Sequence, residues 1–169
     1  MRQKHRLKGG LSVTQRPTYA QLRELLRVIA IDQSQEHEGL RISLETLDVY
    51  DDACQLKLLL RRAEAVPVSH QLLQHADVNI TDDRGGVYGV YVGDMSVLDG
   101  RFGPDFWQYT NTYTFMPTLD PDARELRVEI PSVQTGALGW AETLKDPQSP
   151  GVTTHGPWSF TVQLLAAEA

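Results

Sequence analysis

Alternation between apolar and polar residues is the feature that most limits what this chain can fold into. In the segment 107–115 the odd-numbered positions are mostly aromatic, and the positions between them are glutamine and threonine; the odd set is Trp107, Tyr109, Asn111, Tyr113 and Phe115. The segments 126–130 and 158–164 repeat the pattern with apolar residues at even-numbered positions. A period of two sends alternate side chains to opposite faces of a β-strand. The sequence therefore predicts an all-β chain whose strands bury one face.

The segment 40–62 predicts a β-hairpin with one buried face. Leucine and isoleucine occupy every second position on both sides of an acidic turn. The apolar positions change parity between Leu44 and Leu47, and a slip of one residue would turn the apolar face outward. A β-bulge near Glu45 and Thr46 restores the burial of both halves of the strand, so we expect one there.

A second hairpin is predicted from 78–80 and 87–92, because the acidic, glycine-containing segment between them is typical of a turn. Together with the strands described above, this hairpin gives the chain seven or eight predicted strands. Such a number of alternating strands is typical of an antiparallel β-sandwich of two sheets around a shared core. A closed barrel is the alternative, because the number of strands does not decide whether a sheet closes.

The beginning of the chain is the one place where helix and strand compete. Apolar residues recur at helical spacing within 17–33, but the β-branched run that begins at Val28 favours a strand, so a short helix is expected only before it. We predict a flexible basic arm over 1–17 and a single β-sandwich domain over 18–169. With 169 residues and Cys54 as its one cysteine, the domain must be held by packing alone.

Several stretches carry a resemblance to a known family. They are VIAIDQSQ at 28–35 leading into GLRISLE at 39–45, ITDDRGGVY at 80–88, FMP at 115–117 with LRVEI at 126–130, and GPWSF at 156–160. Together they resemble the immunoglobulin-like domains attached to bacterial membrane-bound anti-sigma-factor-like proteins and related uncharacterised envelope proteins, over roughly 26–165. The resemblance implies an immunoglobulin-like sandwich of bacterial origin, and it carries no catalytic residue to this chain.

The charge of the chain argues against a domain dedicated to nucleic acid. Its formal net charge is -6, whereas proteins that bind phosphate backbones need a basic surface. Basic residues gather only at the start of the chain, at Arg2, Lys4, Arg6 and Lys8. Contact with RNA, a membrane surface or an acidic partner is therefore expected only through this arm, and a solvated terminus is its simpler interpretation.

No apolar run is long enough to span a bilayer, and the basic start is not followed by the apolar stretch of a signal peptide. We therefore expect no transmembrane segment. The compartment stays open, and the missing signal-peptide pattern favours the cytoplasm.

Motifs for catalysis are absent from the sequence. It has no Gly-x-Ser-x-Gly motif. Cys54 begins an apolar strand with no histidine beside it, so a buried and inert thiol is expected. The pair Gly85 and Gly86 lacks the Lys-Ser/Thr that grips phosphates. We predict no catalytic residue and no cofactor.

A metal site is not predicted either. Asp82 and Asp83 lack the spacing of a calcium loop, and aspartates in hairpin turns usually bind nearby backbone N–H groups. His70 and His75 are five residues apart, which places them on one face of neither a helix nor a strand. A small metal-dependent enzyme built from these residues is the weakest of the functional hypotheses.

The leading hypothesis is a noncatalytic module for protein–protein interaction, or a structural subunit of a larger bacterial assembly, that binds another protein or itself. Beside the basic arm, the candidate contact residues are Phe102, Phe106 and Trp140, which lie in or next to the loops expected over 94–105 and 132–156. A carbohydrate-binding module is the alternative, because an exposed aromatic strand at 107–115 and an exposed Trp140 would stack on sugars. The polar opposite parity of that strand favours a buried core instead.

Overall fold

The computed structural model describes residues 24–63, 72–92, 100–102, 105–137 and 152–164 of the chain. In these ranges the regular structure is all strand, and none of the described residues is helical. The expected helical start is wrong from Leu25 onward, since the first strand, β1 (Leu25–His37), begins there. The predicted arm and residues 18–23 lie outside the described ranges.

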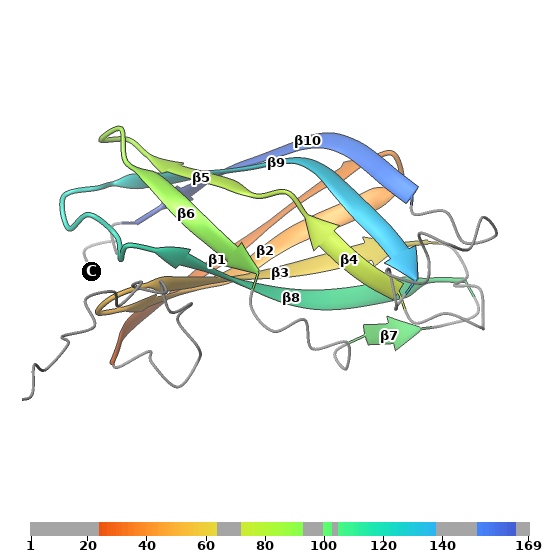
Figure 1. Cartoon of the computed structure of the whole chain (residues 1–169), viewed down its shortest axis with the longest axis horizontal. Coiled ribbons are helices and arrows are strands. Elements are labelled where there is room, and N and C mark those ends of the chain that lie inside the picture. The colour runs from red at the N-terminus through yellow and green to blue at the C-terminus, as the bar shows by residue number, and fades with distance from the viewer. Residues whose placement is uncertain (1–23, 64–71, 93–99, 103–104, 138–151, 165–169) are drawn as a thin grey trace, which may run out of the picture.

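Eight strands form one continuous antiparallel path, β1-β2-β3-β8-β6-β5-β9-β10, and two short strands attach to it. The strands of the path after β1 are β2 (Leu40–Tyr50), β3 (Cys54–Arg62), β8 (Trp107–Met116), β6 (Val87–Val92), β5 (Asn79–Asp82), β9 (Glu125–Ala137) and β10 (Val152–Gln163). The attached strands are β4 (Leu72–Ala76) on β9 and β7 (Gly100–Phe102) on β8. The path curls until β1 and β10 lie side by side, which gives a nearly closed barrel (Figure 1).

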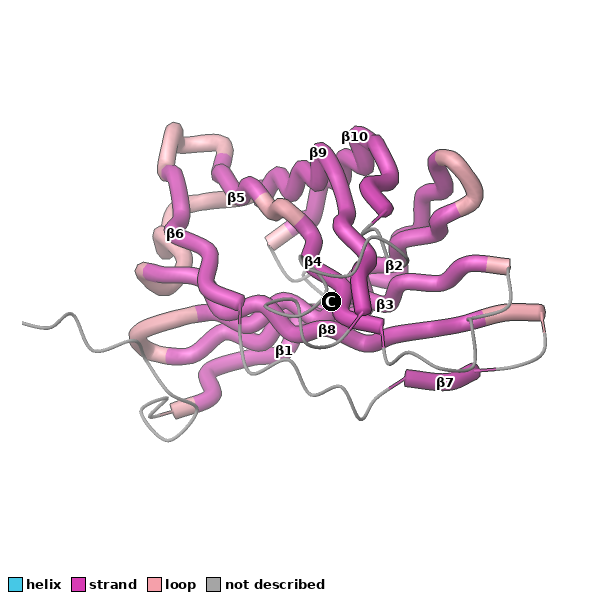
Figure 2. Tube along the Cα trace, turned by 45° about the vertical axis from the view of Figure 1, so that its right-hand side comes forward, coloured by secondary structure: helices cyan, strands magenta, loops and turns pink. Residues whose placement is uncertain are grey.

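Both predicted hairpins are confirmed. β2 pairs with β3 and β5 pairs with β6, each across a short turn (Figure 2). The predicted bulge is also present, because the register between β2 and β3 shifts at Glu45. The ladder between β1 and β2 shifts at the same place, because two residues of β1, Ile31 and Asp32, lie opposite the single residue Glu45 of β2. Asp32 has a φ of 51°, in the left-handed region that a bulge can require.

The expected two-sheet, immunoglobulin-like sandwich is not what the structure shows. β6 is a corner strand, whose first residues, Val87 and Tyr88, pair with β5 and whose later residues, from Gly89, pair with β8. This strand joins two halves that a sandwich would keep as separate sheets. An in-and-out alternation of side chains is identical in a sandwich and in a barrel, so the sequence pattern did not distinguish them.

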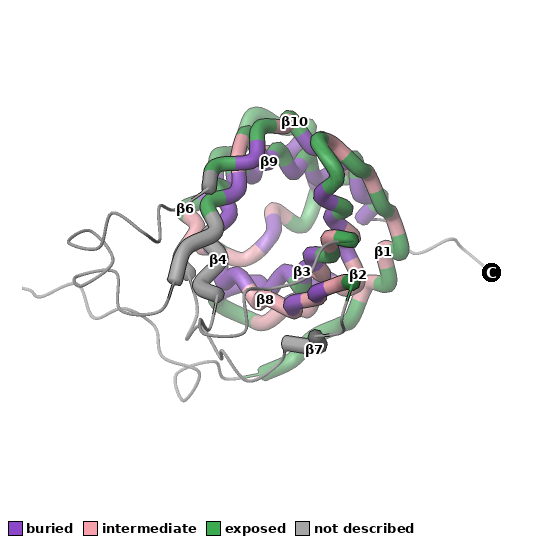
Figure 3. Tube along the Cα trace, turned by 90° about the vertical axis from the view of Figure 1, so that its right-hand side faces the viewer, coloured by how far each residue is buried: buried purple, intermediate pink, exposed green. Residues whose placement is uncertain are grey.

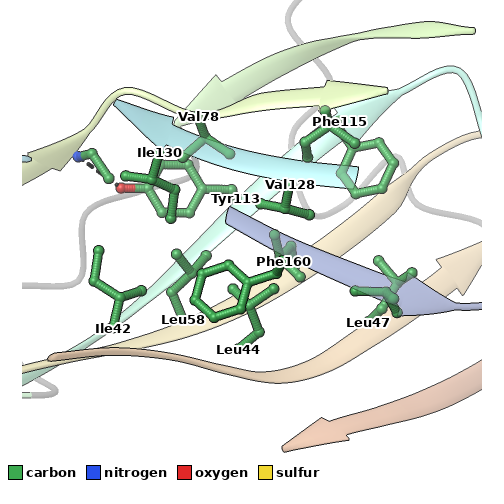
Figure 4. Packing of buried hydrophobic residues seen from close by; sticks show 14 of the residues in the cluster. Ile42, Leu44, Leu47, Leu58, Val78, Tyr113, Phe115, Val128, Ile130 and Phe160 are labelled. Carbon is green, nitrogen blue, oxygen red and sulfur yellow. Dashed lines mark hydrogen bonds between the residues drawn. The ribbon is translucent and has the colours of Figure 1, made fainter. Parts of the chain in front are cut away.

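The core fills the inside of the barrel. Figure 3 looks along the barrel and shows the buried residues on its inner wall. The aromatic residues of β8 are among them, since Trp107, Tyr109, Tyr113 and Phe115 are all at most 4% exposed. Tyr113 also accepts a hydrogen bond from the backbone N–H of Ala76 at 3.1 Å, which ties the end of β4 to the core (Figure 4).

Two predicted loops are shorter than expected. The loop predicted over 132–156 is partly strand, because β9 continues to Ala137 and β10 begins at Val152. The irregular loop predicted over 94–105 contains the short strand β7. These strand segments lack clear alternation in the sequence. They are held as strands by pairing, since β9 pairs with β4 and with the beginning of β10, and β7 pairs with β8.

Candidate functional site

The acidic turn between β5 and β6 is built around the carboxylate of Asp82. Its Oδ1 accepts the backbone N–H groups of Arg84 at 2.9 Å and Gly86 at 2.7 Å, and its Oδ2 accepts the Tyr88 hydroxyl at 2.7 Å. Burial alone would raise the pKa of this carboxyl, but the hydrogen bonds, led by that from Tyr88, outweigh it and lower the pKa. Both oxygens are already used by the protein, so they are poorly placed to bind a cation.

The neighbouring Asp83 has a similar structural role in the next turn. Its Oδ1 accepts the backbone N–H groups of Arg124 at 3.0 Å and Glu125 at 3.3 Å. The hydrogen bond from Arg124 is the main cause that lowers the pKa of Asp83. These contacts agree with the turn interpretation. Within the described ranges, no group of three or more histidines, cysteines and acidic residues is arranged to hold a metal ion.

The described histidines do not converge. The ring of His37 lies edge-on to Trp158 with 5.5 Å between ring centroids, and His155 donates its backbone N–H to the Glu38 carboxylate at 3.1 Å. His75 pairs through its backbone with Gln134 in β9. His5 and His70 lie outside the described residues.

Cys54 is a buried thiol at the start of β3, as expected from its apolar surroundings. Its Sγ lies 3.9 Å from the Thr118 hydroxyl, and burial raises the pKa of the thiol. A thiol with a raised pKa is mostly protonated at neutral pH and is a poor nucleophile.

The predicted partner-binding residues have different positions in the structure. Phe106 is half-buried, and the guanidinium carbon of Arg61 lies 5.3 Å from its ring centroid. Phe102 pairs through its backbone with Trp107. Trp140 and the basic residues Arg2, Lys4, Arg6 and Lys8 lie outside the described residues. Phe102 and Phe106 are therefore the members of the predicted set that lie among the described residues.

The aromatic face of β8 offers no stacking platform for sugars, because its side chains are buried. The alternative of a carbohydrate-binding module then depends on Trp140 alone. As for the membrane, the described part of the chain has no helix with the length and apolarity needed to cross one.

The seam between β1 and β10 is the most unusual feature of the described barrel. No backbone ladder joins these two strands among the described residues, although they are adjacent. Side chains of β1 reach across instead. Gln33 donates to the Thr161 carbonyl at 2.9 Å, and Gln35 both donates to the Ser159 carbonyl and accepts the Ser159 N–H.

Both ends of the seam are fixed by charged side chains. Arg27 donates to the Leu164 carbonyl at 2.9 Å at one end. At the other end, Glu38 accepts the backbone N–H of His155. The seam is thus closed along its length by side chains of the β1–β2 hairpin.

An exposed apolar patch lies on the outside of β1, at the beginning of the strand. The β1 apolar patch consists of Leu25, Leu26 and Val28, which are 49%, 56% and 54% exposed. The register between β1 and β2 shifts between Leu25 and Arg27, and this irregularity turns consecutive leucines outward beside Tyr50. The patch was not predicted, because Leu25 and Leu26 recur at the helical spacing that competes with a strand at the beginning of the chain.

Comparisons with known proteins give the fold only. No family model and no curated protein matches the chain. A search of solved structures finds a chain described as the conserved domain protein from Bacillus anthracis, with a TM-score of 0.53 and 15% sequence identity. The match covers 82% of this chain and 49% of that chain, so this chain spans about half the length of its structural neighbour. The resemblance to immunoglobulin-like domains of anti-sigma-factor-like proteins stays a prediction.

Proposed function

We propose that this domain is a noncatalytic module for protein–protein interaction. The observation that carries the proposal is the β1 apolar patch, in which three large apolar side chains, each about half exposed, lie within four consecutive positions of a single strand. Isolated apolar residues are common on protein surfaces, whereas groups of them often mark contact sites.

The energetics of burial support a contact at this patch. Covering the exposed half of a leucine or valine side chain contributes on the order of 1 kcal/mol, so the patch would contribute a substantial part of a moderate affinity. The acidic turn supports the noncatalytic part of the proposal. The Asp82 and Asp83 carboxylates accept hydrogen bonds from the protein itself and so have a structural role.

The experiment compares the wild type with a patch variant and a matched surface variant. Leu26→Asp combined with Val28→Asp places charges in the β1 apolar patch. Val87→Asp is the control, because Val87 is 77% exposed and lies on β6, with three strands between it and β1 along either direction of the barrel. All proteins are used for sedimentation over a range of concentrations and for quantitative affinity capture from the source cells.

We expect the patch variant to capture at least about tenfold less partner than the wild type, or to self-associate at least about tenfold more weakly, whereas the control should behave as the wild type. Equal recovery with all three proteins, or a strict monomer that captures nothing, would refute the proposal.

A further inference from the structure

The edge of β10 that faces β1 is occupied by side-chain amides where a closed barrel would have a strand. The amide of Gln35 engages both backbone groups of Ser159, and the amide of Gln33 engages the Thr161 carbonyl. A glutamine amide has the same donor and acceptor groups as a peptide bond. These side chains therefore present to β10 the hydrogen bonds that a neighbouring strand would present.

Between the contacts of Arg27 and Glu38, β10 itself lacks the usual protection of an edge strand. From Trp158 to Leu164 the sequence WSFTVQL has no charged residue and no proline. The pairing of this segment with β9 is regular from Trp158 to Gln163, with the irregularity confined to the preceding residues. Charges, prolines and bulges are the common means of preventing strand pairing at an edge. Here the amides of β1 occupy the edge instead.

The amide contacts are weaker than the ladders elsewhere in the barrel. The hydrogen bonds of Gln33 and Gln35 are exposed to solvent, and each requires a long side chain to be held in one conformation. A strand supplies the same groups from a backbone that is already extended. It can therefore compete with the two amides for the edge.

We propose that β10 binds an extended segment of a partner protein by strand addition, with the segment taking the place of the Gln33 and Gln35 amides. This inference rests on the proposed function and specifies the partner's chemistry. Ile29 and Ile31 pack against the core beside the seam, and Phe160 is buried on β10. The barrel-facing side chains of the segment must therefore be apolar. Its outward side chains lie beside Ser159 and Thr161 and are polar.

The test uses a fluorescein-labelled peptide of alternating threonine and valine with lysines at its N-terminus. Its Kd is measured by fluorescence anisotropy with the full chain as wild type, as Gln33→Ala combined with Gln35→Ala, as Ser159→Pro and as Ser159→Ala. Proline at 159 removes an N–H that points to β1 and leaves the ladder with β9 intact. The alanine variant is its matched control.

The glutamine variant should bind the probe about tenfold more tightly than the wild type, the change expected when two exposed hydrogen bonds no longer compete. Ser159→Pro should lose binding and Ser159→Ala should keep it. Hydrogen exchange of the Ser159 amide gives an independent readout. That amide should exchange faster in the single variant Gln35→Ala and slow down when the probe is added.

A probe N-methylated at every residue binding as well as the original would overturn strand addition, as would equal binding by the proline and alanine variants or no binding by any variant. If sedimentation without the probe instead shows a dimer that only Ser159→Pro abolishes, the occupant is a second copy of the chain and the proposal of a separate partner is wrong. If the probe experiments refute strand addition but partner capture still depends on the β1 apolar patch, the further inference is wrong and the proposed function is retained.

Discussion

Replacing Tyr88 by phenylalanine and Asp82 by asparagine, singly and together, should reveal a coupling free energy of about 1.5 kcal/mol between these side chains. The hydroxyl of Tyr88 and the carboxylate of Asp82 are 2.7 Å apart, and both residues are 7% exposed. A hydrogen bond to a charged group contributes about 1.5–3 kcal/mol to stability.

Each single change should therefore destabilise the fold by about 2 kcal/mol, since either one removes that hydrogen bond. Asparagine at 82 keeps an oxygen for the backbone N–H groups of Arg84 and Gly86, which limits its cost. The double variant should lose little more than either single variant, because the same contact is lost only once.

The assay is urea denaturation at neutral pH, followed by circular dichroism and tryptophan fluorescence. For a chain of this size each kcal/mol also changes Tm by about 2–4 °C, so thermal denaturation provides a second measurement. The reasoning is refuted if the loss of unfolding free energy in the double variant equals the sum of the two single losses to within about 0.5 kcal/mol. The two side chains would then act independently.

The same pair predicts how stability depends on pH. The folded-state pKa of Asp82 is lowered, so its contribution is present above the ordinary pKa of 3.8 and is lost as the pH falls through the lower folded value. Burial, with the hydrogen bond to Asp82, raises the pKa of Tyr88 from 10.0 to about 12. Stability that is fully present below pH 10.0 is therefore lost as the pH rises toward about 12, and Tyr88→Phe should remove this alkaline loss.

Three further variants or treatments test the packing. Tyr113→Phe leaves the buried N–H of Ala76 without its acceptor and should cost about 1–3 kcal/mol in urea denaturation; a loss below about 0.5 kcal/mol would contradict this. Gly86→Ala would place a Cβ against the carboxylate of Asp82, so it should lower Tm by several degrees and abolish the coupling with Tyr88. The thiol of Cys54 should react with a thiol-specific reagent only as the protein unfolds, whereas fast labelling of the folded protein would show that its burial is wrong.

The strands and hairpins could be predicted because their signals are local. Alternation identified the buried faces of β2, β3 and β8, and the change of parity between Leu44 and Leu47 located the bulge at Glu45. Closure of the barrel is not local. It depends on β6 changing partners at Gly89, and the residues on either side of that glycine would alternate in the same way within a sandwich.

The seam between β1 and β10 has a signal in the sequence, although the seam was not predicted. The positions of β1 that face inward are occupied first by Ile29 and Ile31 and then by Gln33, Gln35 and His37. Glutamines at positions where the period requires core residues indicate a strand that needs polar partners on the inside. The identity of those partners, the backbone groups of β10, could not be predicted because they are more than a hundred residues away in sequence.

This separation in sequence has a consequence for how the barrel assembles. The contact between Arg27 and the Leu164 carbonyl joins residues 137 positions apart, whereas the β1–β2 and β2–β3 ladders join near neighbours. Closing a long loop costs more chain entropy than closing a hairpin, and at the seam side-chain hydrogen bonds, most of them exposed, take the place of a backbone ladder. We therefore expect the hairpins to form early and the seam to form last and open first. Transient opening would then expose the β10 edge in a protein that is otherwise folded.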